Sequence, residues 1–264
     1  CNIIRGHLPK DLNGAYLRNG PNASLLHRGE GFHLFDGDGM IHSIMMRNGS
    51  ASYCSRFVQT SRFRQEQAVG RPLFLKFFGG MNGPTGVARV LISGLRATFG
   101  LVDFTRGFGL SNTNVAFFNG HVLSLSEEDM PYIVKITEDG DIVTLRQFKL
   151  PSKSNMCAHP KFDPISGEMY AFSLNLPFFP PFSVFRVSAD GVKSADIPVP
   201  LLDVPLVHDF ALTRRFIIFP DNQLAMRPTE LAKGEMPLAC DLNKTPRFCL
   251  LPRYALPEES SDSK

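Results

Sequence analysis

The stretch Asn155-Met-Cys-Ala-His-Pro-Lys-Phe-Asp-Pro164 places a histidine and a proline at the start of a segment with β-strand character. A second such start is Val207-His-Asp-Phe210, and an earlier one begins at Asn114. The starts at Asn114, His159 and His208 are separated by 45 and 49 residues. Four short antiparallel strands repeated at about this period are typical of the blades of a β-propeller. The repeat therefore predicts an all-β propeller.

Turn residues divide the repeated units into short apolar segments, as the propeller interpretation requires. They stand at Asn119-Gly120, Glu138-Asp-Gly140, Ser166-Gly167 and Ala189-Asp-Gly191. We predict four strands within 114–148, four within 158–199, and a third, less regular unit from 207 to 251. A β-sandwich is the alternative fold, but it gives no reason for the period.

The first part of the chain also contains strand and turn patterns. The tripeptide Arg47-Asn-Gly49 lies between alternating segments and predicts a hairpin that joins strands at 40–46 and 50–58. Two further short strands are predicted at 15–18 and 32–35. The motif Asp36-Gly-Asp-Gly39 that follows is interpreted as a turn, because a calcium-binding EF-hand loop needs a longer series of acidic residues.

Composition narrows the class of protein. With 43% hydrophobic residues, the 264 residues can build a core, and 20 prolines, 22 glycines and 23 phenylalanines beside no tryptophan favour a β-rich fold. A net charge of +3 without a Lys/Arg run argues against nucleic acid as a partner. Five widely spaced cysteines are interpreted as reduced thiols. The chain begins at Cys1 without a targeting segment, so we expect a processed or partial chain.

One segment departs from the β pattern. Apolar residues recur at helical spacing after Gly83, at Val87, Val90, Leu91 and Leu95, and predict a helical insertion at about 84–100. The preceding segment 72–78 is aromatic. An apolar helix face beside aromatic side chains can dock on a membrane surface. The alternative is that the helix covers part of the core.

The two histidines at unit starts are candidate metal ligands. In a propeller the first strand of each blade lines the central channel, so His159 and His208 are expected to meet near the axis. Neutral imidazole nitrogens bind divalent transition metals, although two of them are too few for a complete site. The other five histidines are interpreted as turn, core or surface residues: His7, His27, His33, His42 and His121.

Motifs along the whole chain resemble the carotenoid cleavage dioxygenases, most closely their plant plastid type, the group-four enzymes. They include 8–21, Phe35-Asp-Gly-Asp-Gly-Met-Ile-His42, Leu123-Ser-Leu-Ser-Glu-Glu-Asp-Met-Pro-Tyr132, Ala158-His-Pro-Lys-Phe-Asp-Pro164, 208–213 and Leu251-Pro-Arg-Tyr254. The resemblance implies a seven-bladed β-propeller with helices over its top face. Residues 1–264 would form the N-terminal part of one such domain, incomplete at its C-terminal end.

The resemblance also implies a cofactor and a site. The family holds one non-haem Fe(II) by four histidines, of which the first falls on His159 and the second on His208. Glu127 matches a glutamate that accepts the other N–H of a ligand histidine. The remaining two ligands would lie beyond Lys264.

The implied reaction is cleavage of a conjugated C=C bond of a carotenoid or apocarotenoid by O2, giving two carbonyl products. The family takes its substrate from membranes through an apolar tunnel. Substrate or membrane access is accordingly assigned to Phe74, Phe77, Phe78, Val87, Leu91 and Leu95. Candidate tunnel residues are Phe178, Phe179 and Phe182, for which ordinary loop packing is an equal alternative. The implied location is the plastid, in the chloroplast stroma, at the thylakoid surface or at a plastoglobule, with a peripheral membrane or plastoglobule surface as a partner.

Three hypotheses follow for function. The chain is the N-terminal part of an active carotenoid dioxygenase, a truncated non-catalytic or pseudogene product that lacks two iron ligands, or a member of an isomerase or stilbenoid-cleaving branch. An open reading frame beyond Lys264 with two more histidines would favour the first hypothesis, and a stop codon the second. We expect no turnover from the 264 residues alone.

Overall fold

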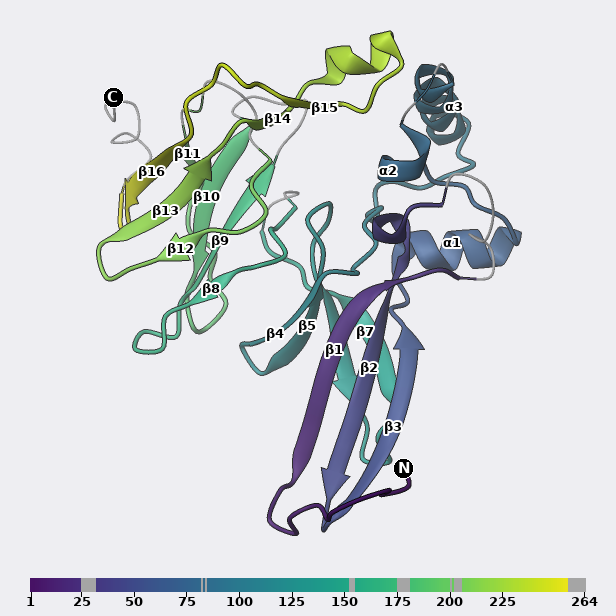
Figure 1. Cartoon of the computed structure of the whole chain (residues 1–264), viewed down its shortest axis with the longest axis vertical. Helices are drawn as coiled ribbons and strands as arrows, with labels where there is room; N and C mark the ends of the chain where they lie inside the picture. The colour runs from purple at the N-terminus through teal and green to yellow at the C-terminus, as the bar shows by residue number, and fades with distance from the viewer. Residues whose placement is uncertain are drawn as a thin grey trace.

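The strands form a succession of antiparallel sheets arranged along an arc (Figure 1). The computed structural model describes residues 1–24, 32–81, 83, 85–151, 155–174, 181–199, 201 and 206–255. Mostly β structure with few helices agrees with the predicted fold class. The first sheet has the order β1-β2-β3 and consists of β1 (Gly14–Asn22), β2 (Asp38–Arg47) and β3 (Ser50–Phe57). Asn48 and Gly49 adopt positive φ in the β2–β3 turn, which confirms the predicted hairpin.

The strand predicted at 32–35 is wrong. Residues Leu34–Asp36 form the short 3-10 helix η2 instead. Asp36 is buried, and its carboxylate accepts hydrogen bonds from the backbone N–H groups of Phe78 and Gly79 at 2.9 and 2.6 Å. The side chain of His33 accepts a further bond from the N–H of Phe35. These local bonds turn the chain where the apolar residues alone suggested an extended segment.

Two complete four-stranded sheets follow, in the predicted order. The first contains β4 (Asn114–Phe118), β5 (His121–Leu125), β6 (Tyr132–Ile136) and β7 (Ile142–Gln147). The second contains β8 (Lys161–Phe162), β9 (Met169–Leu174), β10 (Phe182–Val187) and β11 (Ile197–Pro198). The strands of this unit were predicted to begin at 158, but β8 begins at Lys161, because Pro160 has no N–H to donate and the carbonyl of Ala158 accepts from Asn114.

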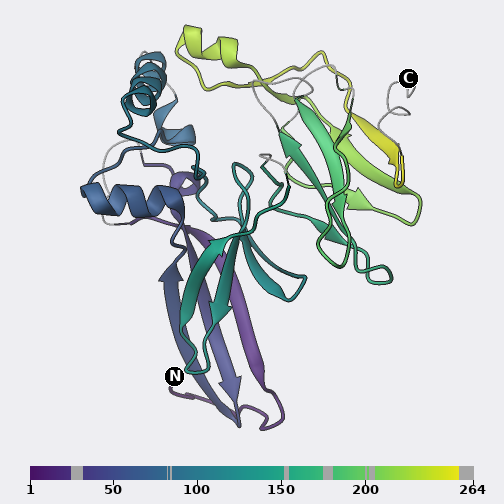
Figure 2. The ribbon, with the colours of Figure 1, turned by 180° about the vertical axis from the view of Figure 1, so that it is seen from behind.

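The third unit is interrupted by an inserted arm. Its sheet has the order β12-β13-β16 and consists of β12 (Ala211–Leu212), β13 (Phe216–Asp221) and β16 (Arg247–Pro252). Between β13 and β16 the arm forms β14 (Leu224–Met226), the 3-10 helix η3 (Pro228–Lys233) and β15 (Leu238–Cys240). The arm extends towards the helices, where the N–H of Gly83 donates to the carbonyl of Gly234 at 2.7 Å (Figures 1 and 2).

Aromatic side chains fill the space between the second and third units. Phe172, Phe182 and Phe219 are almost fully buried, and the ring of Phe182 lies 5.0 Å from that of Phe172 and 5.2 Å from that of Phe219. Such edge-to-face and tilted pairs stabilise a core beyond simple burial. Phe182 is therefore a core residue and not part of a tunnel wall, while Phe178 and Phe179 lie outside the described residues.

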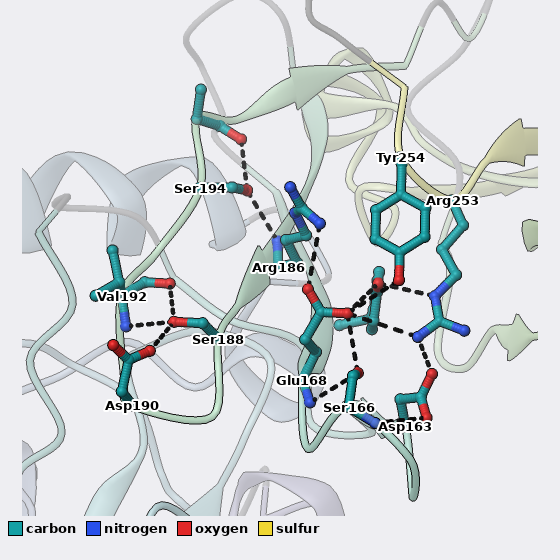
Figure 3. A network of polar contacts seen from close by, with 12 residues as sticks. Asp163, Ser166, Glu168, Arg186, Ser188, Asp190, Val192, Ser194, Arg253 and Tyr254 are labelled. Atoms are coloured by element: carbon teal, nitrogen blue, oxygen red, sulfur yellow. Dashed lines mark hydrogen bonds and ion pairs between the residues drawn. The ribbon is translucent and has the colours of Figure 1, made fainter.

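A polar network joins the end of β16 to the β8–β9 hairpin (Figure 3). The guanidinium of Arg253 pairs with Asp163 and donates from Nε to the hydroxyl of Tyr170 at 2.8 Å. Tyr170 donates to Glu168 at 3.0 Å, and Glu168 also accepts from Arg186 at 3.2 Å. Charge-assisted bonds of this kind are strong when their members are shielded from water. The network ties together the two sheets that carry His159 and His208.

Three helices gather at one end of the first two sheets (Figures 1 and 2): α1 (Ser61–Val69), α2 (Phe77–Gly80) and α3 (Gly86–Thr98). α3 falls inside the predicted insertion at 84–100. The sequence did not predict α1, which has little apolar periodicity and depends on Thr60 accepting from the N–H of Phe63 at its start. Within the described residues, no helix is long and apolar enough to cross a bilayer.

Candidate metal centre

His159 and His208 lie side by side at the inner edge of two successive sheets. His159 stands two residues before β8, and His208 three residues before β12. Their Nε2 atoms are 3.1 Å apart, with ring centroids 4.6 Å apart and planes at 69°. The equivalent placement in neighbouring units thus brings two residues together that are 49 positions apart in sequence.

Glu127 orients His208. Its carboxylate accepts a hydrogen bond from Nδ1 of His208, from the loop that follows β5. Burial raises the pKa of Glu127, and the charge of His208 acts in the opposite direction. Because Nδ1 carries the proton in this bond, Nε2 of His208 retains its lone pair and faces His159. The pair of residues therefore presents one imidazole nitrogen as an acceptor or ligand.

Asn114 fixes the backbone that leads into His159. Its Nδ2 donates to the carbonyl of Ala158 at 3.0 Å, and its Oδ1 accepts from the N–H of Val115 at 2.8 Å. Nδ2 also lies 3.5 Å from Nδ1 of His159. The three unit starts therefore meet, as the repeat predicts for the innermost strands.

An ion pair beside the histidines joins the two sheets, and it was not predicted from the sequence. Lys161 and Asp209 are 2.7 Å apart, and the hydrogen bonds from Lys161 and from the N–H of Phe210 outweigh burial and lower the pKa of Asp209. The pKa of His159 is lowered by burial, and the nearby charges of His208 and Lys161 add to this. The charge of Asp209 acts in the opposite direction, and the net lowering of the pKa favours the neutral form of His159, which is the form that binds metals. Each member of the pair lies within two residues of a site histidine, which is the pattern that could have found it.

The two imidazoles fit adjacent positions around a transition metal. Nitrogen ligands lie about 2.1 Å from such a metal, so two of them at right angles are about 3 Å apart. The 3.1 Å between the Nε2 atoms matches this separation, and imidazole is a suitable ligand for Fe(II). Among the described residues no group of three or more His, Cys, Asp or Glu side chains forms a metal cluster. The described part of the chain therefore brings together two candidate ligands.

The predicted access residues occupy two different places. Phe74 is buried, and together with Phe77 and Phe78 it lines a cavity of about 230 Å³ between α2, η2 and neighbouring loops. The apolar stripe of α3 faces outward instead, with Val87, Leu91 and Leu95 exposed by 42%, 63% and 56%.

The basic side of α3 faces the protein. Arg89 donates to the carbonyl of Gly80 at 3.2 Å, and Arg96 donates to that of Leu73 at 2.7 Å. The apolar face is thus directed away from the described core, the reverse of the usual arrangement in a globular protein. This outward face is the part of the helical region that is available to an apolar surface.

Comparisons with known proteins agree on one family. The family model described as Retinal pigment epithelial membrane protein matches residues 1–264. The probable carotenoid cleavage dioxygenase 4 of Arabidopsis thaliana, named as chloroplastic, is 44% identical over 97% of this chain and 44% of its own length. The chloroplastic 9-cis-epoxycarotenoid dioxygenase NCED1 of rice is 39% identical over 98% of this chain and 42% of its own length. The chain thus spans about half the length of these relatives.

Solved structures agree with the propeller fold. A lignostilbene dioxygenase from Pseudomonas brassicacearum matches with a TM-score of 0.73 and 25% identity, over 94% of this chain and 49% of the other. A variant of the Synechocystis apocarotenoid oxygenase matches with a TM-score of 0.74 and 22% identity, over 95% of this chain and 52% of the other. The second likeness concerns the fold alone. The family model, the relatives and the shared fold together establish that this chain belongs to the carotenoid cleavage dioxygenase family.

Proposed function

We propose that the protein carrying this chain is a non-haem iron dioxygenase that cleaves one conjugated C=C bond of a carotenoid or apocarotenoid. One molecule of O2 is consumed, and each carbon of the broken double bond receives one oxygen atom, so the products are two carbonyl compounds. The observation that carries the proposal is the convergence of His159 and His208, with Nε2 atoms 3.1 Å apart. Relatives of 38–44% identity are named as dioxygenases of carotenoids.

The residues of this chain have distinct tasks in the proposed site. His159 and His208 would hold Fe(II) through Nε2, and bound iron supplies the activation of O2. Glu127 keeps the proton of His208 on Nδ1, which directs the lone pair of Nε2 to the metal position. Asn114 holds the carbonyl of Ala158 and so positions the backbone next to His159.

The outward face of α3 supports access from a membrane. Val87, Leu91 and Leu95 form an exposed apolar stripe, and the basic side chains of the helix are engaged with backbone carbonyls. An amphipathic helix with this orientation can insert its apolar face into the boundary of a lipid layer. We infer peripheral docking at a plastid membrane or plastoglobule surface, and the chloroplastic names of relatives support the plastid. The cavity wall formed by Phe74, Phe77 and Phe78 is assigned to the substrate path.

Substitution of His159 tests the proposal. In the protein carrying this sequence, His159→Ala is expected to retain less than about a tenth of the bound iron, since an imidazole ligand is lost. Iron content is measured by atomic emission after desalting. Carbonyl products are measured by chromatography with a panel of carotenoids and apocarotenoids.

The matched control is His7→Ala, because His7 is exposed near the N-terminus and far from the site in sequence. It is expected to retain both iron and turnover. Normal iron content and normal turnover in His159→Ala would refute the assignment. Iron binding without any carbonyl product from the unsubstituted protein would refute the reaction while leaving the metal site.

A further inference from the structure

A cavity of about 230 Å³ lies among α1, η2, α2, α3 and two loops. One of its lining residues, Glu128, directly follows Glu127 of the candidate metal centre in sequence. Its wall is largely aromatic and includes Phe35, Phe74, Phe77, Phe78, Phe104 and Phe108. An apolar cavity of 150 Å³ accommodates benzene, so this one has room for about nine carbon atoms. That is the size of a six-membered ring carrying three methyl groups.

Two charged side chains on this wall have buried polar atoms that form no hydrogen bond within the part of the chain that the structure describes. Arg62 is 4% exposed and donates from Nη1 to the carbonyl of Leu75 at 3.4 Å. Its Nε and Nη2 are buried without a hydrogen-bond partner in the described part of the chain, and Nε is 3.9 Å from Glu66. Oε2 of Glu128 is likewise buried without a partner among the described residues. Buried polar atoms are rarely left unpaired, so these donors and this acceptor indicate a polar group of a ligand.

The other acidic group on the wall is already engaged. Both carboxylate oxygens of Asp36 accept backbone N–H groups at the start of α2. Asp36 therefore holds α2 at the edge of the cavity, and both of its oxygens are already used as acceptors. Recognition of a ligand is left to Arg62 and Glu128, with Ser93 of α3 also on the wall.

The loop 126–131 connects this cavity to the metal centre. Glu127 in it bonds His208, and the next residue, Glu128, lines the cavity. On the other side, Gly109 donates to Asp129 at 3.1 Å, and a side chain at Gly107 or Gly109 would collide with that carboxylate. This close approach holds the neighbouring Phe108 on the cavity wall. A molecule that fills the cavity is therefore adjacent to the loop that orients a metal ligand.

We propose that this cavity receives a hydroxylated end ring of the polyene, and that Arg62 and Glu128 select it over an unsubstituted hydrocarbon ring. A single hydroxyl group can accept a hydrogen bond from Arg62 and donate one to Glu128. A hydrocarbon ring of the same shape leaves Nη2 of Arg62 and Oε2 of Glu128 without a hydrogen bond, and sites built in this way reject the analogue that lacks the polar group. The inference rests on the proposed function for its substrate class, but the ring-binding step requires no iron.

Binding of two matched ring compounds tests the proposal. In metal-free protein, equilibrium dialysis with 3-hydroxy-β-ionone and β-ionone is expected to show about tenfold tighter binding of the hydroxylated compound. Glu128→Met removes the acceptor at similar size and is expected to bring the ratio close to one. Glu128→Gln retains an acceptor oxygen and is expected to give an intermediate ratio. Glu138→Met, at the exposed β6–β7 turn, is the matched control and should retain the tenfold ratio.

The outcomes separate this inference from the proposed function. Equal binding of the two compounds by the unsubstituted protein would overturn the ring selectivity, whatever the turnover. An unchanged ratio in Glu128→Met, with circular dichroism that matches the parent, would overturn the role of Glu128. Retention of iron and turnover in His159→Ala would overturn the metal assignment, while a tenfold ratio measured without iron would still support ring selectivity.

Discussion

Polar residues have different roles at the inner edge of the sheets and in the helical region above it. At the inner edge, His208 bonds Glu127, and Asn114 bonds the carbonyl next to His159, so the positions follow from strand register. In the helical region, Arg62 and Glu128 have buried atoms that form no hydrogen bond with the described residues. The first arrangement orients nitrogen atoms towards the proposed metal position, and the second leaves hydrogen-bonding capacity for the proposed ligand. Chemistry and selectivity are thus assigned to separate regions.

One loop belongs to both regions. Its residues 127, 128 and 129 contact in turn a site histidine, the apolar cavity and the loop at Gly109. A change in this loop is expected to affect one region without the other, according to which residue is altered. Substitutions at these three positions therefore test whether the two regions act independently.

The largest effect is expected from Asp129, at the junction of the two regions. Burial raises its pKa to about 6, although it accepts from the N–H groups of Met130 and Gly109 and from Gln147. Below about pH 4 both folded and unfolded states are protonated, and this contribution to stability is fully present. As the pH rises towards 6, the unfolded state ionises first, so unfolding becomes easier by about 3 kcal/mol in total.

Denaturant unfolding at pH 4 to 7 measures this effect, with Asp129→Asn as the comparison. The variant cannot ionise at this position, so the difference in unfolding free energy between the two proteins is expected to change by about 3 kcal/mol across the window. The other ionisable groups are present in both proteins and cancel in the difference. A difference that stays constant with pH would show that Asp129 is ionised in the folded protein throughout.

A smaller effect is expected from Glu127, which contacts His208 at the candidate metal centre. Glu127→Ala removes the acceptor for Nδ1 of His208, and loss of such a supporting carboxylate lowers metal affinity by about 10- to 100-fold. Glu127→Gln retains an acceptor oxygen and is expected to restore part of the loss. Titration with Co²⁺, followed by its visible spectrum, measures the affinity. Unchanged affinity in Glu127→Ala would exclude an orienting role, and loss of the ring-binding ratio would show that the two regions are not separable.

The sequence predicted the regions to different extents for a physical reason. Strand register repeats, so the spacing of Asn114, His159 and His208 indicated both the units and the meeting of the two histidines. The helical region has no repeat. There α1 was missed and η2 was predicted as a strand, because both depend on individual side-chain bonds from Thr60, His33 and Asp36.

The side chains that contact the two histidines were only partly predictable from the sequence. Glu127 came from family resemblance alone, and the ion pair of Lys161 with Asp209 was not predicted, since it joins two sheets whose distance the sequence does not give. The unpaired atoms of Arg62 and Glu128 are a property of burial. They became visible only when α1, the loop at Phe108 and the loop 126–131 were seen around one cavity.

The smallest effect is expected at the outer face of the helical region. Leu91 on α3 is 63% exposed, so Leu91→Ser is expected to change the free energy of unfolding by less than about 0.5 kcal/mol. Its effect on docking is larger, because burying a leucine in an apolar layer contributes about 1.5–3 kcal/mol when complete. Partial burial at a lipid boundary predicts about tenfold weaker binding to galactolipid vesicles in a flotation assay. Leu242→Ser is the matched control, since Leu242 is 81% exposed and lies between β15 and β16, not on α3. If both variants bind vesicles as well as the parent, the apolar face of α3 does not dock on lipid, and the helical region serves the cavity alone.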